Sequence, residues 1–372
     1  MIEKKERLVA LDVFRGITIA SMILVNTPGS WSYVYPPLRH AEWHGFTPTD
    51  LVFPFFLFAV GAAMSFSLRK YGDDKSGAVK KILSRTLIIF FIGVFMNAFP
   101  FYTLGEEGAS FMDLSRFRFM GVLHRIGLAY GAGALLCYFL DKKQLIIASL
   151  AILFGYWGIL YFFGTGDPFS LEGNAVAKLD ILLFGESHLY RGFGIPFDPE
   201  GLLSTLPAVV SVIIGFFAGS YVQREKDKKV LIINTFLYGN GAIFLALVWD
   251  MVFPINKPIW TSSYVLMCSG LALVIISFLI YFVDIRNKKK WIEPFLVFGT
   301  NPLAIYVLSI LWVKIYFKII IGDVNAYAWV YQNVFVQIAG NLNGSLLFAL
   351  SHVIVLWLIG RWMYKKNIII KV

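Results

Sequence analysis

Five residues whose side chains could take part in proton or acyl transfer lie at the boundary of two long apolar segments near the start of the chain: Asn26, His40, Glu42, His44 and Asp50. They occupy 25 residues and consist of two imidazoles, two carboxylates and one amide. Proton transfer or acyl transfer at a membrane boundary needs side chains of these types, because one group must accept a proton while another stabilises charge. The segment is therefore the first candidate for a reactive site.

His40 is the candidate base of this segment. Pro36 and Pro37 fix the backbone before it and disfavour helix, so His40 is expected in an extended segment that folds back over the bundle. A neutral imidazole can accept a proton from an amine or a hydroxyl near neutral pH, and Asp50 could orient the ring or select its tautomer. In the alternative interpretation, Trp43 belongs to an interfacial aromatic belt and the histidines bind lipid headgroups.

The composition predicts an all-α, polytopic integral membrane bundle. Of the 372 residues, 58% are hydrophobic and only 15% are charged, and the mean hydropathy is +0.69. A bilayer needs about 20 mostly apolar residues per helix, which predicts ten spans. The ten spans cover residues 8–26, 51–68, 82–100, 119–140, 145–163, 202–222, 230–250, 261–283, 294–318 and 344–363. Residues 1–372 contain no fixed repeat or low-complexity linker and are taken as one domain.

The charged residues of the first span and the positions of the two cysteines argue against a secreted, disulfide-linked or cysteine-metal protein. Asp12 and Arg15 make the first span too polar to be a cleaved signal peptide. Cys137 and Cys268 both fall within predicted spans, so the sequence predicts neither an extracellular disulfide framework nor a metal site with paired cysteines.

The net charge of +10 predicts a topology and argues against nucleic-acid binding, because the cations alternate from loop to loop. The basic segments are Lys4, Lys5 and Arg7; Arg69, Lys70, Lys75, Lys80, Lys81 and Arg85; Lys142 and Lys143; Arg224, Lys226, Lys228 and Lys229; Arg286 and Lys288 to Lys290; and Lys365, Lys366 and Lys371. The longest intervening loop, 164–201, is mainly acidic. Both termini are therefore expected in the cytoplasm, which places His40 outside.

Several polar residues in or near the spans have two interpretations. Asp12 and Arg15, three residues apart, could neutralise each other, or Arg15 could hold an anionic ligand. His124 and Arg125 could be an interfacial pair with their polar ends turned to water, or could line a reaction chamber.

Further along the chain, Asp198 and Glu200 are typical of a helix start. Asn301 precedes Pro302 and could mark either a helix break or an ordinary helix start. His352, in the middle of the last span, is more typical of a hydrogen-bonded residue between helices than of a catalyst.

Several motifs together resemble the heparan-α-glucosaminide N-acetyltransferase family. They are Leu11-Asp-Val-Phe-Arg-Gly-Ile, Val25-Asn26, the stretch from His40 to Phe58, Gly121-Val-Leu-His-Arg-Ile-Gly, Phe197-Asp-Pro-Glu-Gly-Leu-Leu-Ser-Thr, and Phe253-Pro-Ile-Asn256-Lys257-Pro-Ile-Trp260-Thr-Ser-Ser-Tyr. The resemblance extends from the first span to the ninth and keeps the order of the motifs. Only the His40 to Phe58 stretch is specific by itself.

The resemblance implies a membrane enzyme that takes acetyl-CoA from the cytoplasm and acetylates the amino group of a terminal glucosamine on the opposite side. It implies a catalytic histidine at His40, with the family's asparagine at Asn26 and its aspartate at Asp50. His124 stands where the family pattern has glutamine. The chain begins at the membrane, without the lumenal domain and extra first span of the animal enzyme, which predicts a bacterial inner-membrane protein.

The remaining candidate residues are assigned by class. Arg15, Arg125 and Asn301 are candidates for binding acetyl-CoA. Trp43, His44, His124, Asp198 and Glu200 are candidates for binding the acceptor, which is expected to be an amino sugar or a glycosaminoglycan fragment. No metal is expected, and a homodimer is compatible with the sequence. During the chemistry, His40 could act as a base or could itself carry the acetyl group.

A secondary transporter of a sugar or amino sugar is the competing class, because ten spans with polar residues and broken helices would also suit one. Such a fold predicts two related halves, and residues 1–186 show no matching pattern with residues 187–372. The polar chemistry is also concentrated at one loop boundary instead of the midplane. These observations favour the enzyme.

Overall fold

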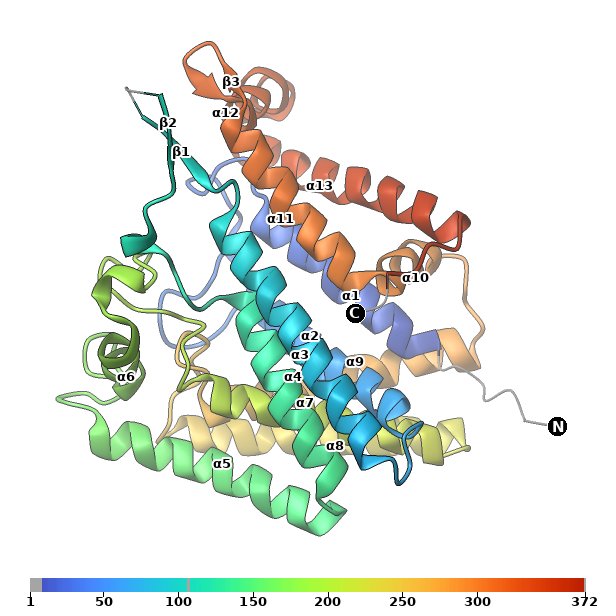
Figure 1. Ribbon diagram of the computed structural model, residues 1–372. Coiled ribbons are helices and arrows are strands. Elements are labelled where there is room, and N and C mark those ends of the chain that lie inside the picture. Colours follow the sequence, from blue (N-terminus) through green and yellow to red (C-terminus); the bar gives the residue numbers. More distant parts are fainter. Residues whose placement is uncertain (1–8, 106–107, 371–372) are drawn as a thin grey trace.

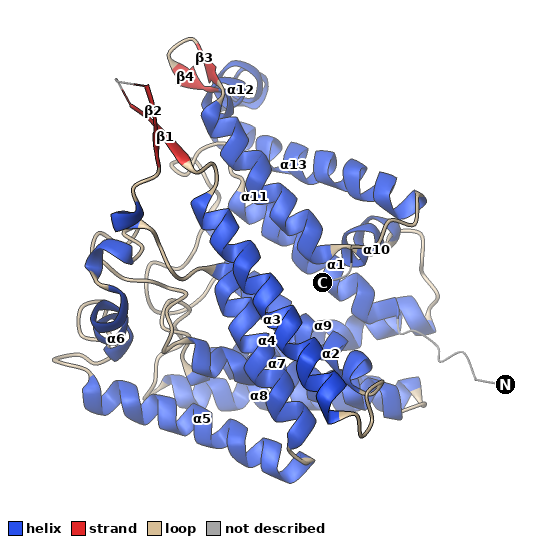
Figure 2. Cartoon of the chain, viewed as in Figure 1, coloured by secondary structure: helices blue, strands red, loops and turns tan. Residues whose placement is uncertain are grey.

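The computed structural model describes residues 9–105 and 108–370 and is a bundle of long helices. Lys4, Lys5, Arg7 and Lys371, which contribute to the predicted charge pattern, lie outside the described residues. The long helices are α1 Val9–Asn26, α2 Val52–Leu68, α3 Lys75–Ala98, α4 Val122–Phe139, α5 Lys142–Phe163, α7 Thr205–Arg224, α8 Lys228–Asp250, α9 Ser262–Leu279, α11 Pro302–Lys318 and α13 Val336–Lys365. All but a few short segments of the chain are helix or loop (Figure 2).

Each predicted span overlaps at least one of these helices. By length and composition, eight helical segments among the described residues could cross a membrane, or nine if a bent pair is counted as one span. The bent pair is α10 Glu293–Thr300 and α11, which meet at 87° around Asn301. The predicted span 294–318 is therefore broken near its start. α3, which is not among the eight, carries four cationic residues in its first half, Lys75, Lys80, Lys81 and Arg85.

Shorter elements lie between the long helices. They are the hairpin β1 Tyr102–Gly105 with β2 Gly108–Phe111, the helix α6 Ala175–Phe184, the hairpin β3 Ile320–Ile321 with β4 Val324–Asn325, and α12 Ala326–Val330. Figure 1 shows the β1–β2 hairpin at the upper left, the β3–β4 hairpin at the top and α6 at the left, with the α2–α3 connection at the lower right. The loop from α1 to α2, which contains His40, runs along the left side of the bundle.

Helix α2 packs closely against α7 near its middle. A Cβ atom at Gly61 would lie 1.9 Å from the carbonyl oxygen of Val212, and one at Gly215 would lie 2.1 Å from that of Phe58. Small residues let two helix backbones approach closely. This is a common basis of helix association within membranes, where the hydrophobic effect does not drive helices together. Asp50 lies in the 3₁₀ turn Pro48–Leu51 directly before α2, the helix that this packing holds.

Candidate active site

Three side chains from two distant loops meet at one end of the bundle. His40 Nδ1 lies 2.6 Å from Asp50 Oδ1, and Lys257 Nζ lies 3.2 Å from the same oxygen. Lys257 Nζ is also 2.9 Å from His40 Nδ1. The side chain of His40 is 43% exposed, whereas those of Asp50 and Lys257 are 1% and 19% exposed. A buried carboxylate therefore holds a ring that faces outward.

The Asp50 carboxylate is held by the backbone around it. Its Oδ2 accepts hydrogen bonds from the amides of Ala41 and Thr47, at 2.9 and 3.0 Å, and from the Thr47 hydroxyl at 3.2 Å. The Tyr264 hydroxyl donates to the Asp50 carbonyl oxygen. Several donors to one buried carboxylate compensate its loss of hydration. Oδ2 is therefore engaged with the loop, and Oδ1 remains for His40 and Lys257.

A second loop, between α8 and α9, brings Lys257 to the site. The amide of Gly45 donates to the Ile255 carbonyl oxygen at 2.7 Å, and the Asn256 side chain donates to the Trp43 carbonyl oxygen at 2.9 Å. Gly45 has φ of 83°, a left-handed conformation that favours glycine. These two bonds tie the His40 loop to the Lys257 loop.

The predicted acceptor residues Trp43 and His44 lie beside this junction. Trp43 Nε1 donates to the Phe169 carbonyl oxygen at 2.8 Å, and its ring packs edge-on against Phe197. His44 is exposed, with Nδ1 3.4 Å from the amide nitrogen of Asn256. Trp43 is therefore held by Phe169 and Phe197, and the loop that carries it borders the site.

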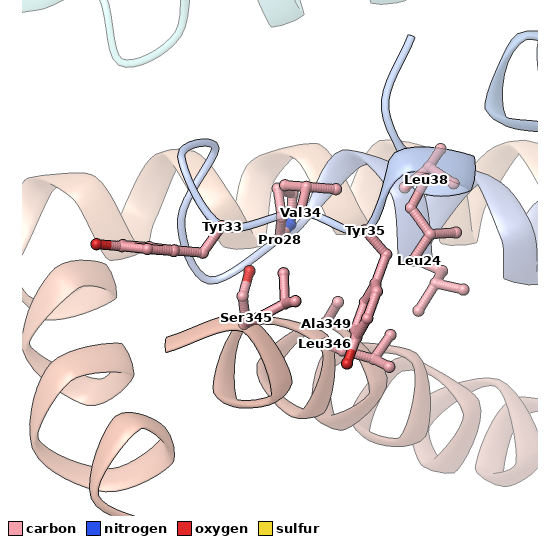
Figure 3. Close-up of a pocket in the computed structure, with 11 residues that line it drawn as sticks. Leu24, Pro28, Tyr33, Val34, Tyr35, Leu38, Ser345, Leu346 and Ala349 are labelled. Atoms are coloured by element: carbon pink, nitrogen blue, oxygen red, sulfur yellow. The ribbon is translucent and has the colours of Figure 1, made fainter. Parts of the chain in front are cut away.

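The part of the loop that precedes His40 packs against α13. The amides of Gly29 and Ser30 donate to the carbonyl and hydroxyl oxygens of Ser345, at 3.3 and 3.2 Å. Figure 3 shows the residues that line a small hollow at this contact: Pro28, Tyr33, Val34, Tyr35 and Leu38 from the loop, Leu24 from α1, and Ser345, Leu346 and Ala349 from α13.

Asn26 ends α1 and is exposed, and no hydrogen bond of its side chain is present among the described residues. Its amide is therefore available as a donor.

The arrangement suits proton transfer. A neutral imidazole that donates Nδ1–H to Asp50 has a lone pair on Nε2, the nitrogen directed away from the carboxylate. Burial lowers the pKa of Lys257, and the Asp50 carboxylate opposes that effect. Sequence reasoning did not select Lys257 as a site residue, although it lies in the Asn256-Lys257-Pro motif, because it is 217 residues from His40.

A second charged cluster lies next to this site. Arg118 forms two hydrogen bonds of 2.7 Å with Asp198 and one of 2.6 Å with Glu200. The Asp198 side chain is fully buried, and those of Glu200 and Arg118 are 12% and 28% exposed. Burial lowers the pKa of Arg118, but the two carboxylates outweigh this effect and raise it above its usual value. The predicted acceptor residues Asp198 and Glu200 are thus paired with an arginine that the sequence did not single out.

The second cluster continues into the bundle through Arg125. Its guanidinium donates to the Ser204 hydroxyl and lies 4.9 Å from the centre of the Trp260 ring. Asp180 accepts a hydrogen bond from the Leu202 amide at 3.0 Å, and its other oxygen has no partner among the described residues. Burial raises the pKa of Asp180 to about 7.

His124 does not face an open chamber. Its ring is 1% exposed and packs edge-on against Phe90, with the centroids 4.7 Å apart. Neither ring nitrogen has a hydrogen-bond partner among the described residues. The structure therefore places His124 among buried helices, and the interfacial arrangement with its polar end turned to water is not present.

The two other candidates for acetyl-CoA lie toward the opposite end of α1. Arg15 pairs with Asp12 at 3.0 Å and also donates to the Gly299 carbonyl oxygen. Both side chains border a hollow of about 300 Å³ between α1 and α2. Asn301 instead binds the chain's C-terminal segment, donating to the Ile368 carbonyl oxygen and accepting from the Ile370 amide, each at 2.8 Å. Both polar atoms of the Asn301 amide are hydrogen-bonded, whereas Arg15 borders open space.

Comparison with known proteins identifies the relatives of this chain. Residues 7–248 match the family described as heparan-alpha-glucosaminide N-acetyltransferase, catalytic. The chain is 30% identical over 360 residues to heparan-alpha-glucosaminide N-acetyltransferase of Mus musculus, a match that covers 81% of this chain and 53% of the mouse protein. The Homo sapiens protein of the same name is also 30% identical, over 358 residues, with 81% of this chain and 52% of that protein covered. The chain thus spans about half the length of these relatives.

Proposed function

Because the chain belongs to the heparan-α-glucosaminide N-acetyltransferase family, we propose that it is a transmembrane acetyltransferase. It transfers an acetyl group from cytoplasmic acetyl-CoA to the amino group of a glucosamine-type sugar on the periplasmic side of a bacterial inner membrane. The observation that carries the proposal is the exposed His40 ring held by the buried Asp50 carboxylate. A positioned base of this kind is what attack by an amine requires.

In the proposed reaction the sugar nitrogen attacks the thioester carbonyl carbon and the carbon–sulfur bond breaks. His40 Nε2 takes the proton that the nitrogen loses, and this proton is then available to the departing thiolate, so that CoA leaves as the thiol. Asn26 donates a hydrogen bond to the oxyanion that develops on the carbonyl oxygen. In a variant of this route, His40 first accepts the acetyl group and then passes it to the amine.

The hollow at Arg15 supports entry of acetyl-CoA from the other end of the bundle. The hollow is lined by the first half of α1 and the second half of α2, whereas the His40 site lies beyond the opposite ends of the same helices. Asp50 and Ala63 are separated by 13 residues, which corresponds to roughly 20 Å along a helix. The phosphates stay near cations such as Arg15, because multiple charges are too costly to bury, and the pantetheine arm covers the distance.

The alternative function, a transporter, draws on the bend between α10 and α11. Broken helices line the binding sites of many transporters. Here the break is occupied by the C-terminal segment, since both polar atoms of the Asn301 amide bind Ile368 and Ile370. This contact favours a structural role for the bend, and the enzyme remains the better-supported proposal.

The test is acetyl transfer by the purified full-length protein in detergent. Acetyl-labelled acetyl-CoA and glucosamine are supplied, and N-acetylglucosamine is detected by mass spectrometry. The proposal predicts labelled product from the wild type and none above background from His40→Ala. Binding of acetyl-CoA without any product would contradict the proposal. Uptake of unmodified amino sugar into proteoliposomes, without acetylation, would establish the transporter instead.

A further inference from the structure

We infer that Lys257 is a positioning residue whose charge opposes protonation of His40 and so keeps the ring able to accept a proton. The inference rests on the proposed acetyl transfer and adds a residue to it. Its basis is the contact of the Lys257 ammonium with both members of the pair, 2.9 Å from His40 Nδ1 and 3.2 Å from Asp50 Oδ1.

Donor and acceptor counting shows what the three groups can do together. Nδ1 can donate a hydrogen bond to Asp50 or accept one from Lys257, but it cannot do both. When it donates, Lys257 donates to Asp50 instead, and Nε2 of His40 presents a lone pair to the acceptor side. Only this arrangement makes His40 a base.

The charges around His40 decide how readily the ring becomes an imidazolium. Asp50, on the turn before α2, attracts a second proton to the ring, while Lys257 repels it. Farther out, Glu200 near the start of α7 and Cys268 on α9 act on Lys257, and His44 lies on the same loop as His40. With Asp50 and Lys257 both charged, the ring faces a pair of no net charge. Removing the ammonium leaves the carboxylate alone, which favours the protonated ring that cannot accept a proton.

Lys257 is held in place by a tight turn. The amide of Ile259 donates to the Asn256 side chain at 3.0 Å, and the amide of Trp260 donates to the Lys257 carbonyl oxygen at 3.0 Å. Trp260 has φ of 49°, a left-handed conformation that is unfavourable for a large side chain. Its ring is 1% exposed and packs against Phe53 at 5.1 Å, which offsets that strain. The turn therefore fixes the lysine stem and aims it at His40.

The test compares Lys257→Met, which removes the charge, with Lys257→Arg, which keeps it. Diethylpyrocarbonate acylates imidazole only when the ring is unprotonated, so the rate of His40 modification between about pH 5 and 8 reports the protonation of the ring. Modification is measured by peptide mass spectrometry on the full-length protein in detergent. His188, which is bound through Nδ1 to the Phe117 carbonyl oxygen, serves as the reference ring in the same molecule.

We expect the His40 midpoint to rise by about one pH unit or more in Lys257→Met, and the midpoint in Lys257→Arg to stay near that of the wild type. The acid limb of kcat/KM for acetyl transfer should move in the same direction in Lys257→Met. An unchanged His40 midpoint in that variant, with an unchanged His188 midpoint, would overturn the inference and leave Lys257 a structural residue. If Lys257→Met is not monodisperse, Lys257→Gln gives the same comparison. Labelling does not depend on catalysis, so an inactive wild type would contradict the proposed function without deciding the role of Lys257.

Discussion

The His40 site and the Arg118 cluster are neighbours that use charge in different ways. Trp43, on the His40 loop, packs against Phe197, the residue before Asp198. In the first site, a ring that is 43% exposed rests on a buried carboxylate, with an ammonium beside both. In the second, Arg118 is committed to two carboxylates by three hydrogen bonds of 2.6 to 2.7 Å. The His40 site leaves a ring nitrogen accessible, whereas the polar atoms of the Arg118 cluster bind one another.

Exposure and pairing distinguish polar residues that could react from polar residues that hold a membrane bundle together. Burying a charge is costly, so a buried pair that loses one partner strongly destabilises the fold. Removing an exposed ring that is held by a buried partner costs less stability. Its substitution is expected to affect mainly the reaction. Substitutions at the first site should therefore change turnover, and substitutions at the second should change stability.

The largest expected effect is on catalysis at His40. His40→Ala should reduce acetyl transfer by about 10²- to 10⁴-fold, the usual contribution of a general base, while acetyl-CoA binding persists. Turnover and binding are measured with the purified protein. His188→Ala is the matched control, because this histidine lies in the loop 164–201, where its Nδ1 is bound to the Phe117 carbonyl oxygen and its ring packs against Phe119. Full activity of His40→Ala would remove His40 from the mechanism.

The second effect is on stability at Arg118. Arg118→Ala leaves the buried Asp198 carboxylate without its partner and should lower the free energy of unfolding by about 3 to 5 kcal/mol. Thermal unfolding in detergent measures the change. Arg116→Ala is the control, since the Arg116 side chain is 84% exposed and only two residues away. If Arg118→Ala were as stable as the wild type but inactive, the second cluster would belong to the chemistry and the comparison would fail.

A third prediction concerns Asn26. Asn26→Ala should lower kcat by about 10²-fold or more if its amide stabilises the oxyanion, because that contact forms fully only in the transition state. Stability should change little, since the side chain is exposed at the end of α1. Asn240→Ala, at an exposed position on α8, is the control. An unchanged kcat would show that Asn26 only ends the helix and takes no part in acetyl transfer.

The smallest effect is the pH dependence of stability at Asp180. Burial raises the pKa of this carboxyl from 3.8 to about 7, so the folded protein binds its proton more tightly than the unfolded chain does. The stabilisation from this group is therefore complete below the unfolded pKa and is lost as the pH rises through about 7, by roughly 2.5 kcal/mol between pH 5 and 8. Asp180→Asn should flatten the profile of thermal stability over that range, whereas Glu186→Gln should not. An identical slope in the wild type and Asp180→Asn would show that Asp180 is already ionised.

The sequence was most informative where local patterns dominate. Runs of apolar residues predicted ten spans. Each overlaps a helix, and eight or nine of the described helical segments are long and apolar enough to cross a membrane. The break at Asn301 was weighed against an ordinary helix start, and the structure has both, since Pro302 begins α11 at an 87° bend. Sequence reasoning also selected His40 and Asp50, which are ten residues apart in the same loop and lie in contact.

Contacts between distant segments were not predictable in the same way. Lys257 and Arg118 reach their partners across 217 and 80 residues, and a single sequence gives no measure of such separations. Asp198 and Glu200 fitted a helix start from local pattern, and their pairing with Arg118 needed the packed bundle. His124 was expected at an interface or a chamber, but the packing of α3 against α4 encloses it beside Phe90.

The most direct test of transfer across the membrane uses sealed proteoliposomes of known orientation. Cys137 and Cys268 are first replaced by alanine, and a single cysteine at Ser32 or Ser76 then reports, through an impermeant thiol reagent, which end of the bundle faces outward. Acetyl-CoA is supplied on the Ser76 side and glucosamine on the Ser32 side. If acetyl transfer crosses the membrane, N-acetylglucosamine accumulates on the Ser32 side and no product forms when the two substrates are exchanged. Product formed only when both substrates share one side would contradict transfer across the membrane.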